Sequence, residues 1–101
     1  MSNYWLYNEL KDQPHLEVDS NYHELISVSY NGENYKIYSP SSAEYIITID
    51  VVQKVEALGG NTISFPTSWC QASREAIIYG KKHGVSVMPH GALLGMLDAR
   101  E

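Results

Sequence analysis

The chain has little cysteine and no long apolar run. Cys70 is the single cysteine among 101 residues, so an internal disulfide cannot form. No uninterrupted apolar segment is long enough to cross a bilayer, and residues 1–10 lack the basic region and the apolar stretch of a secretion signal. We therefore expect a cytoplasmic protein that does not bind membranes.

The sequence also lacks the spacing of a metal site. Four histidines and one cysteine are scattered too widely for zinc ligands, so we predict no structural metal. The remaining composition, 44% hydrophobic and 19% charged, is that of an ordinary globular protein. At this length we expect one hydrophobic core and a single domain over residues 1–101.

Basic residues are scarce in the first half of the chain. Residues 1–50 carry eight acids and two lysines, a net charge of −6, whereas residues 51–101 carry five bases and four acids, a net charge of +1. Sequence-independent binding of nucleic acid depends on cationic groups, so the first half disfavours it. Nucleic acid stays open as a partner only for the second half.

The clearest structural signal is a β-hairpin. Asn31-Gly32 separates two β-rich runs, residues 23–30 and 33–38, and this dipeptide favours a type I′ turn. The two-residue loop fixes the register and divides the side chains between two faces. The core face pairs Tyr30 with Glu33, Val28 with Tyr35 and Ile26 with Ile37, and the polar face pairs Ser29 with Asn34, Ser27 with Lys36 and Leu25 with Tyr38.

Helices and strands are expected on both sides of the hairpin. Residues 3–12 favour a short helix that ends before Pro14, and residues 45–49 fit either a strand or the approach to a helix. The expected order then continues with a helix from Asp50, its N-cap, to Gly59, a strand over 62–65, a helix over 69–83 that Ser68 caps and Gly84 ends, a strand over 85–88 and a helix over 91–97. Such alternation places two parallel strands in one sheet. We predict an α/β fold: a small mixed sheet in which an antiparallel β-hairpin is followed by helix, strand, helix, strand and helix, with the helices flanking the sheet.

The second half of the chain resembles a known family. Its successive segments are Asp50-Val-Val-Gln-Lys-Val-Glu-Ala-Leu-Gly, Thr-Ile-Ser-Phe-Pro-Thr-Ser and Gln71-Ala-Ser-Arg-Glu-Ala-Ile-Ile-Tyr-Gly-Lys-Lys-His-Gly. In this order they resemble the C-terminal part of Mrr-type nucleases in the restriction-endonuclease-like, PD-(D/E)XK superfamily, over residues 33–97. The resemblance implies a catalytic hairpin with an acid on one strand and Glu-x-Lys or Gln-x-Lys on the next, which together bind Mg²⁺ and activate water.

The residues that correspond to this motif depart from the family's pattern. The triplet is Asn34-Tyr35-Lys36, in which asparagine replaces the acid or glutamine, and its neighbours on the polar face are serines. Amide and hydroxyl groups make a poor magnesium site. A nuclease would need Asp19 or Glu24 to approach Lys36 as catalytic residues, with Mg²⁺ as the cofactor. The departure favours a protein that uses no cofactor.

Aromatic residues are concentrated in the acidic half. Seven of the eight tyrosines fall within the first 45 residues, together with Trp5. Tyrosine gives a large contact area and carboxylates can meet a basic partner, so this half is typical of a protein-binding surface. The binding residues that we predict are Trp5, Tyr22, Glu24, Lys36 and Tyr38, of which Tyr38 is expected on the polar face of the hairpin.

Other reactive or charged residues have simpler explanations. Cys70 is expected in the first turn of a helix, where the dipole favours thiolate, but a small buried cysteine is the better interpretation. Thr67-Ser68 could hold an anion at the same helix terminus, although capping explains both residues. Lys81-Lys82-His83 suits the last turn of a helix, and His90 is expected in a turn without a role.

The leading functional hypothesis is a non-catalytic macromolecule-binding module. We expect a protein partner, bound through the acidic, tyrosine-rich first half. A homodimer is a further option, because an edge strand of the hairpin offers unpaired backbone groups. Two alternatives stay open: a Mg²⁺-dependent nuclease or nuclease subunit that uses Lys36 with Asp19 or Glu24, and an acidic inhibitor that mimics nucleic acid.

Overall fold

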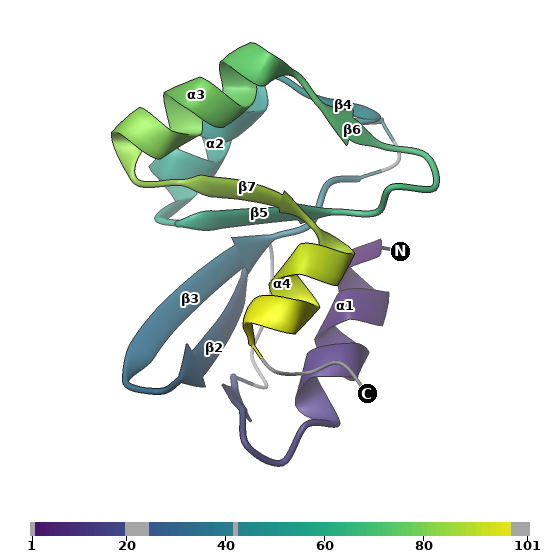
Figure 1. The fold of residues 1–101 in the computed structure, drawn as a ribbon, viewed down its shortest axis with the longest axis vertical. Coiled ribbons are helices and arrows are strands. Elements are labelled where there is room, and N and C mark those ends of the chain that lie inside the picture. The colour runs from purple at the N-terminus through teal and green to yellow at the C-terminus, as the bar shows by residue number, and fades with distance from the viewer. Residues whose placement is uncertain (1, 20–24, 42, 98–101) are drawn as a thin grey trace.

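Helices on both faces of a mixed β-sheet make up the fold (Figure 1). The structure is a computed structural model that describes residues 2–19, 25–41 and 43–97. Its elements in chain order are α1 (Ser2–Lys11), β1 (Glu17–Val18), β2 (Ile26–Tyr30), β3 (Glu33–Tyr38), β4 (Ile46–Ile47), α2 (Ile49–Leu58), β5 (Thr62–Phe65), β6 (Gln71–Ala72), α3 (Arg74–His83), β7 (Ser86–Pro89) and α4 (His90–Met96). The α/β class and the mixed sheet are as the sequence predicts.

The main sheet combines antiparallel and parallel pairing. Its strand order is β1-β2-β3-β5-β7, and β4 and β6 form a separate sheet of two strands. β1, β2 and β3 are antiparallel neighbours, whereas β5 runs parallel to both β3 and β7. Parallel neighbours need a crossover, which α2 supplies between β3 and β5 and α3 supplies between β5 and β7. The last strand of the hairpin therefore joins the parallel part of the sheet.

The hairpin has the expected turn and register. Asn31 and Gly32 have φ angles of 56° and 82°, and a type I′ turn requires positive φ at both positions. The five pairs in the β2–β3 ladder are those that the two-residue loop predicts. The sixth expected pair, Leu25 with Tyr38, lies beyond the end of the ladder.

The first helix after the hairpin ends as predicted but begins earlier. Its N-cap is Thr48, so the assignment of Asp50 as the cap is wrong. Asp50 lies in the first turn, where its carboxylate still interacts favourably with the helix dipole. Gly59 closes the helix in the left-handed conformation, with φ of 87°.

The predicted start of the next helix is wrong. Ser68 lies in a turn, and α3 begins only at Arg74. The cap is Ser73, whose Oγ accepts a hydrogen bond from the backbone N–H of Ala76 at 3.1 Å. The residues between the two serines include β6, and its parallel pairing with β4 keeps them extended. Residues 45–49, which fit a strand or a helix, thus contain both β4 and the start of α2.

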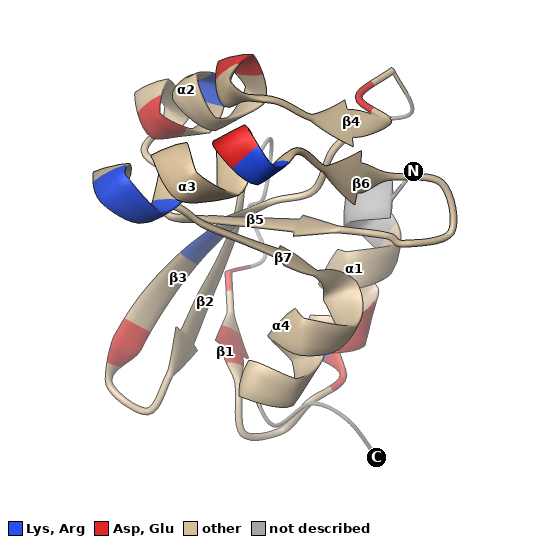
Figure 2. Ribbon diagram, turned by 45° about the horizontal axis from the view of Figure 1, so that its top comes forward, with Lys and Arg blue, Asp and Glu red and all other residues tan. Residues whose placement is uncertain are grey.

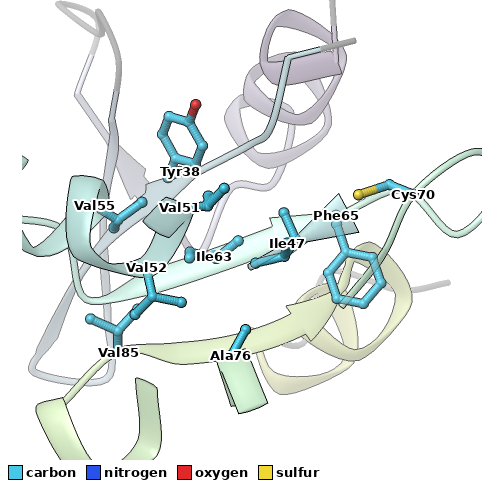
Figure 3. Close-up of a cluster of buried hydrophobic side chains, with 10 residues drawn as sticks. All are labelled: Tyr38, Ile47, Val51, Val52, Val55, Ile63, Phe65, Cys70, Ala76 and Val85. Atoms are coloured by element: carbon cyan, nitrogen blue, oxygen red, sulfur yellow. The ribbon is translucent and has the colours of Figure 1, made fainter. Parts of the chain in front are cut away.

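The sheet divides the expected single core into two clusters. α1 and α4 cover one face, and their buried side chains pack with β2 and β3; the cluster includes Leu6, Leu10, Ile26, Val28, Ile37, Leu93 and Leu97. α2 and α3 cover the other face (Figure 1). Figure 3 shows the second cluster, which contains Tyr38, Ile47, Val51, Val52, Val55, Ile63, Phe65, Cys70, Ala76 and Val85.

The described helices are short. α1, α2 and α3 have ten residues each, and α4 has seven. Within residues 2–19, 25–41 and 43–97, none has the length and apolar character that crossing a membrane would need.

Candidate functional site

A pocket lies over the polar side of β1, β2 and β3. Its volume is about 610 Å³, and its polar lining comes from Glu17, Asp19, Ser27, Ser29, Asn34 and Lys36. α2 and α3 pack over the other end of this sheet face, against β5, β7 and the end of β3. Among the described residues, no helix packs over the polar face of the hairpin beside them. We refer to this site as the hairpin pocket.

The side chains of the hairpin pocket form two rows across the strands. Glu17 lies opposite Ser29, and Ser29 lies opposite Asn34. Just beyond the end of β1, the N–H of Asp19 donates to the carbonyl of Ser27 at 2.9 Å. Because Ser27 pairs with Lys36, the second row runs from Asp19 to Lys36.

The two rows place charges of both signs at opposite sides of the pocket. Figure 2 shows an acidic residue on β1, a second one just beyond its end, and a basic residue along β3. Adjacent strands lie about 4.8 Å apart, so the backbones that carry Asp19 and Lys36 are separated by about 10 Å. Two carboxylates face one ammonium group across a row of hydroxyl and amide groups. The hairpin pocket thus carries a net negative charge.

The side chain of Asn61 fixes β3 beside the pocket. Its Oδ1 accepts from the backbone N–H of Lys36 at 2.9 Å, and its Nδ2 donates to the carbonyl of Asn34 at 3.1 Å. These bonds extend the β3–β5 pairing beyond the first paired residues, Ile37 and Thr62. Ser29 donates to the Oδ1 of Asn34 at 2.7 Å, which orients that amide.

The structure brings together only some of the predicted site residues. Lys36 and Asp19 line the hairpin pocket, whereas Tyr22 and Glu24 lie outside the described residues. Trp5 is half-exposed on α1, which covers the opposite face of the sheet. The predicted binding residues therefore do not form one surface. Glu17, which sequence reasoning missed, lines the pocket instead.

Tyr38, predicted as a binding residue on the polar face, lies on that face but is buried there. Its side chain is 6% exposed, because α2 covers this end of the polar face. The hydroxyl donates to Oε1 of Glu44 at 2.5 Å, and the ammonium of Lys54 lies 4.8 Å from the ring centroid. Burial and the hydrogen bond to Glu44 raise the pKa of Tyr38. Tyr38 is part of the core.

Glu44 connects the loop after β3 to α2. Its carboxylate also accepts from the N–H of Ser41 at 2.9 Å and from Nζ of Lys54 at 2.7 Å. Burial alone would raise the pKa of Glu44, but the hydrogen bonds from Lys54, Tyr38 and Ser41 outweigh it and lower the pKa. These contacts stabilise the ionised carboxylate in a structural role.

The other tyrosines are mostly turned inward. Tyr7 is buried, and Tyr30 and Tyr35 are half-buried against the first core cluster. Tyr45 is 61% exposed and lies just before β4. The tyrosine-rich surface expected from the sequence is therefore absent from the described part of the first half, because these rings fill a small core.

Cys70 is buried and does not lie in a helix. It precedes β6, so no helix dipole acts on it, and the expected first-turn position is wrong. Its Sγ lies 3.3 Å from the carbonyl of Glu44, and burial raises the pKa of the thiol. The same correction removes the anion site proposed at Thr67-Ser68, where no helix begins.

His90 is a buried residue rather than a turn residue. It starts α4, and its Nδ1 lies 2.5 Å from Oγ of Ser64. The ring of Trp5 lies 5.4 Å away, between centroids. Burial lowers the pKa of His90 from 6.5 to about 4. The imidazole therefore stays neutral at physiological pH.

A magnesium site for the nuclease alternative does not fit the described residues. Among them, no group of three or more histidine, cysteine, aspartate or glutamate side chains could hold a metal ion. The hairpin pocket offers two carboxylates, one on β1 and one just after it, and the asparagine of the corresponding triplet is already bonded to Ser29.

Comparison with known proteins gives no relative. No protein-family model matches the chain, and neither a curated protein nor a solved structure matches it significantly.

Proposed function

We propose that the protein is a non-catalytic binding module that holds a protein partner at the hairpin pocket. The observation that supports this proposal is a pocket at the polar end of a sheet face that α2 and α3 cover elsewhere and that no described helix covers there. A pocket of about 610 Å³ has room for a few side chains of a partner. Its strands are held in register from both sides, which gives a rigid contact surface.

The charges of the hairpin pocket favour a basic side chain from the partner. Glu17 and Asp19 can accept hydrogen bonds from a guanidinium group, and such pairs are short and directional. Lys36, on the far side, can donate to a carbonyl or carboxylate of the same partner. A nucleic-acid phosphate would instead meet two carboxylates for one ammonium group, so a protein is the better match.

In the proposed interface, acidic residues of the first half contact the partner, and the tyrosines of this half do not. Since most described tyrosines of that half are buried or half-buried, hydroxyl, amide and carboxylate groups must supply the contacts. Such a polar surface suits a transient partner rather than a permanent apolar interface.

Titration of ¹⁵N-labelled protein with a peptide that alternates glycine and arginine tests the proposal. We expect amide shifts at residues 17–19, 27–29 and 34–36, and none on α3. A peptide that alternates glycine and glutamate is the matched control and should leave these signals unchanged. Shifts spread evenly over the surface, or equal responses to both peptides, would show that the hairpin pocket is not a specific site.

A nuclease is the second candidate, because Asp19 and Lys36 line the same pocket. The elements α2, β5, α3, β7 and α4 also follow the hairpin in the order that the resemblance to Mrr-type nucleases implies, with β4 and β6 as additional short strands. Incubation with plasmid and Mg²⁺ or Mn²⁺, beside Lys36→Ala, separates the candidates. If the protein is a binding module, the plasmid should stay intact in both samples. Cleavage that depends on Lys36 would instead show that the protein is a nuclease.

A further inference from the structure

The open edge of β7 offers a second contact surface, separate from the hairpin pocket. Among the described strands β7 pairs with β5 alone, and Figure 1 shows it at the edge of the sheet between α3 and α4. Ser86 donates its N–H to the carbonyl of Asn61 on the β5 side. Because backbone groups alternate along a strand, the N–H and carbonyl of Val87 point away from β5.

α3 lies directly over β7. A Cβ atom built on Gly80 would lie 2.4 Å from the carbonyl oxygen of Val85 and 3.3 Å from Cγ2 of Val87, so helix and strand are in close contact. Tyr79 and His83 face α2, where the Tyr79 hydroxyl and the His83 ring both approach Glu56. The side of α3 that faces away from α2 therefore borders the open edge of β7.

That flank of α3 is apolar at its centre and basic at its ends. Ile77 is 44% exposed. Since Ala76 and Gly80 face the sheet and Tyr79 faces α2, the helical repeat places Ile77 on the side of the open edge. Arg74 and Lys81 lie one turn before and after it, and both are exposed. Figure 2 shows basic residues near both ends of α3.

The two edges of the sheet differ in charge. β1 contains Glu17 and is followed by Asp19, whereas β7 consists of Ser-Val-Met-Pro and carries no charge. Charged residues on an edge strand discourage pairing with another chain. An uncharged edge beside two cations favours a strand that brings carboxylates.

We propose that β7 receives an extended acidic segment of a partner protein as an added β-strand. Val87 would supply one donor and one acceptor to the added strand, Ile77 would contact an apolar side chain, and Arg74 and Lys81 would pair with carboxylates. Pro89 has no N–H, so the added segment is short, on the order of three to five residues.

The test uses an acetylated and amidated peptide of sequence Glu-Val-Glu-Val-Glu and ¹⁵N-labelled protein. The Val87 amide signal should shift, and its hydrogen exchange should slow, with saturation. Lys81→Glu should raise the dissociation constant by about tenfold, because it reverses one ion pair. Ile77→Asp, at an exposed site that does not endanger folding, should have a similar effect. Lys11→Glu on α1 is the matched control and should change the constant by less than about twofold.

Four results would overturn the proposal. The peptide could leave Val87 unchanged, or the lysine analogue Lys-Val-Lys-Val-Lys could bind equally well, which would remove the role of charge. A Val87 shift that grows with protein concentration without peptide, together with a dimer mass, would assign the edge to a second copy of the chain. Binding of a short DNA duplex in place of the acidic peptide would assign the cations to nucleic acid.

Discussion

Asn61 and Lys36 are joined by two hydrogen bonds that couple the entry of β5 to β3. The Oδ1 of Asn61 accepts from the backbone N–H of Lys36 at 2.9 Å, and the backbone N–H of Asn61 donates to the carbonyl of Lys36 at 3.0 Å. Asn61 directly precedes β5, and its side chain bonds the backbone of β3 where β5 itself no longer pairs with it. It holds the strand that carries the ammonium group of the hairpin pocket.

Asn61→Ala should destabilise the fold by about 1 to 2 kcal/mol, because it leaves backbone groups of β3 without partners. Asn61→Asp keeps the Oδ1 acceptor and loses the donor to Asn34, so its loss should be smaller. Urea denaturation of both variants checks this order. Equal stability of the alanine variant and the parent protein would show that water replaces the side chain.

The free energy of unfolding should decrease as the pH is lowered, because His90 titrates at a lower pH in the folded protein than in the unfolded chain. The pKa of the folded state lies at about 4 and the ordinary value is 6.5, so the unfolded chain takes up a proton first as the pH falls. The stabilisation is complete above pH 6.5 and decreases toward pH 4, by on the order of 3 kcal/mol.

Urea denaturation of His90→Gln between pH 7.5 and pH 4 measures this contribution. The variant should show a shallower decline in the free energy of unfolding than the parent protein. Parallel curves for the parent protein and His90→Gln would show that His90 titrates normally.

Glu44→Ala should destabilise the fold by about 2 kcal/mol or more, since Tyr38 and Lys54 both lose their partner. Because the pKa of Glu44 is lowered, this contribution is present above the ordinary value of 4.5 and lost as the pH falls below it. Thermal unfolding at pH 7 and pH 3.5 checks both points. Glu33→Ala, at an exposed acid beside the hairpin turn, should have little effect at either pH.

Two glycines in helices should respond oppositely to alanine. Gly80→Ala places a methyl group 2.4 Å from the Val85 carbonyl, so it should destabilise the protein by about 2 kcal/mol despite a gain in helix propensity of about 1 kcal/mol. Gly91 has open space around it, and Gly91→Ala should be neutral or stabilising. Chemical denaturation of the pair checks the close approach of α3 to β7.

Local sequence signals predicted the fold where the deciding contacts are local. Asn31-Gly32 specifies the turn without help from the rest of the chain, and Gly59 ends α2 for the same reason. The start of α3 was missed because Ser68 and Ser73 both match a helix cap. The choice between them depends on β6 pairing with β4, about 25 residues earlier, which no local pattern reveals.

The site was predicted less completely than the fold. Strand alternation correctly placed Lys36 on the polar face, but it could not show that α2 buries Tyr38 on the same face. Glu17 was missed because β1 has only two residues and therefore no clear alternation. The alternation Glu17-Val18-Asp19 was the available sequence signal that both acids lie on the same face of a strand.

The affinity of the glycine–arginine peptide for a charge-reversed hairpin pocket tests the proposed function most directly. Isothermal titration calorimetry would compare the parent protein with the double variant Glu17→Lys, Asp19→Lys and with the control Glu9→Lys, Glu75→Lys, which makes the same change in net charge on exposed helical residues. We predict that the pocket variant raises the dissociation constant by at least about tenfold and that the control stays close to the parent protein. Equal losses in both double variants, or no saturable binding by the parent protein, would contradict a specific site at the hairpin pocket.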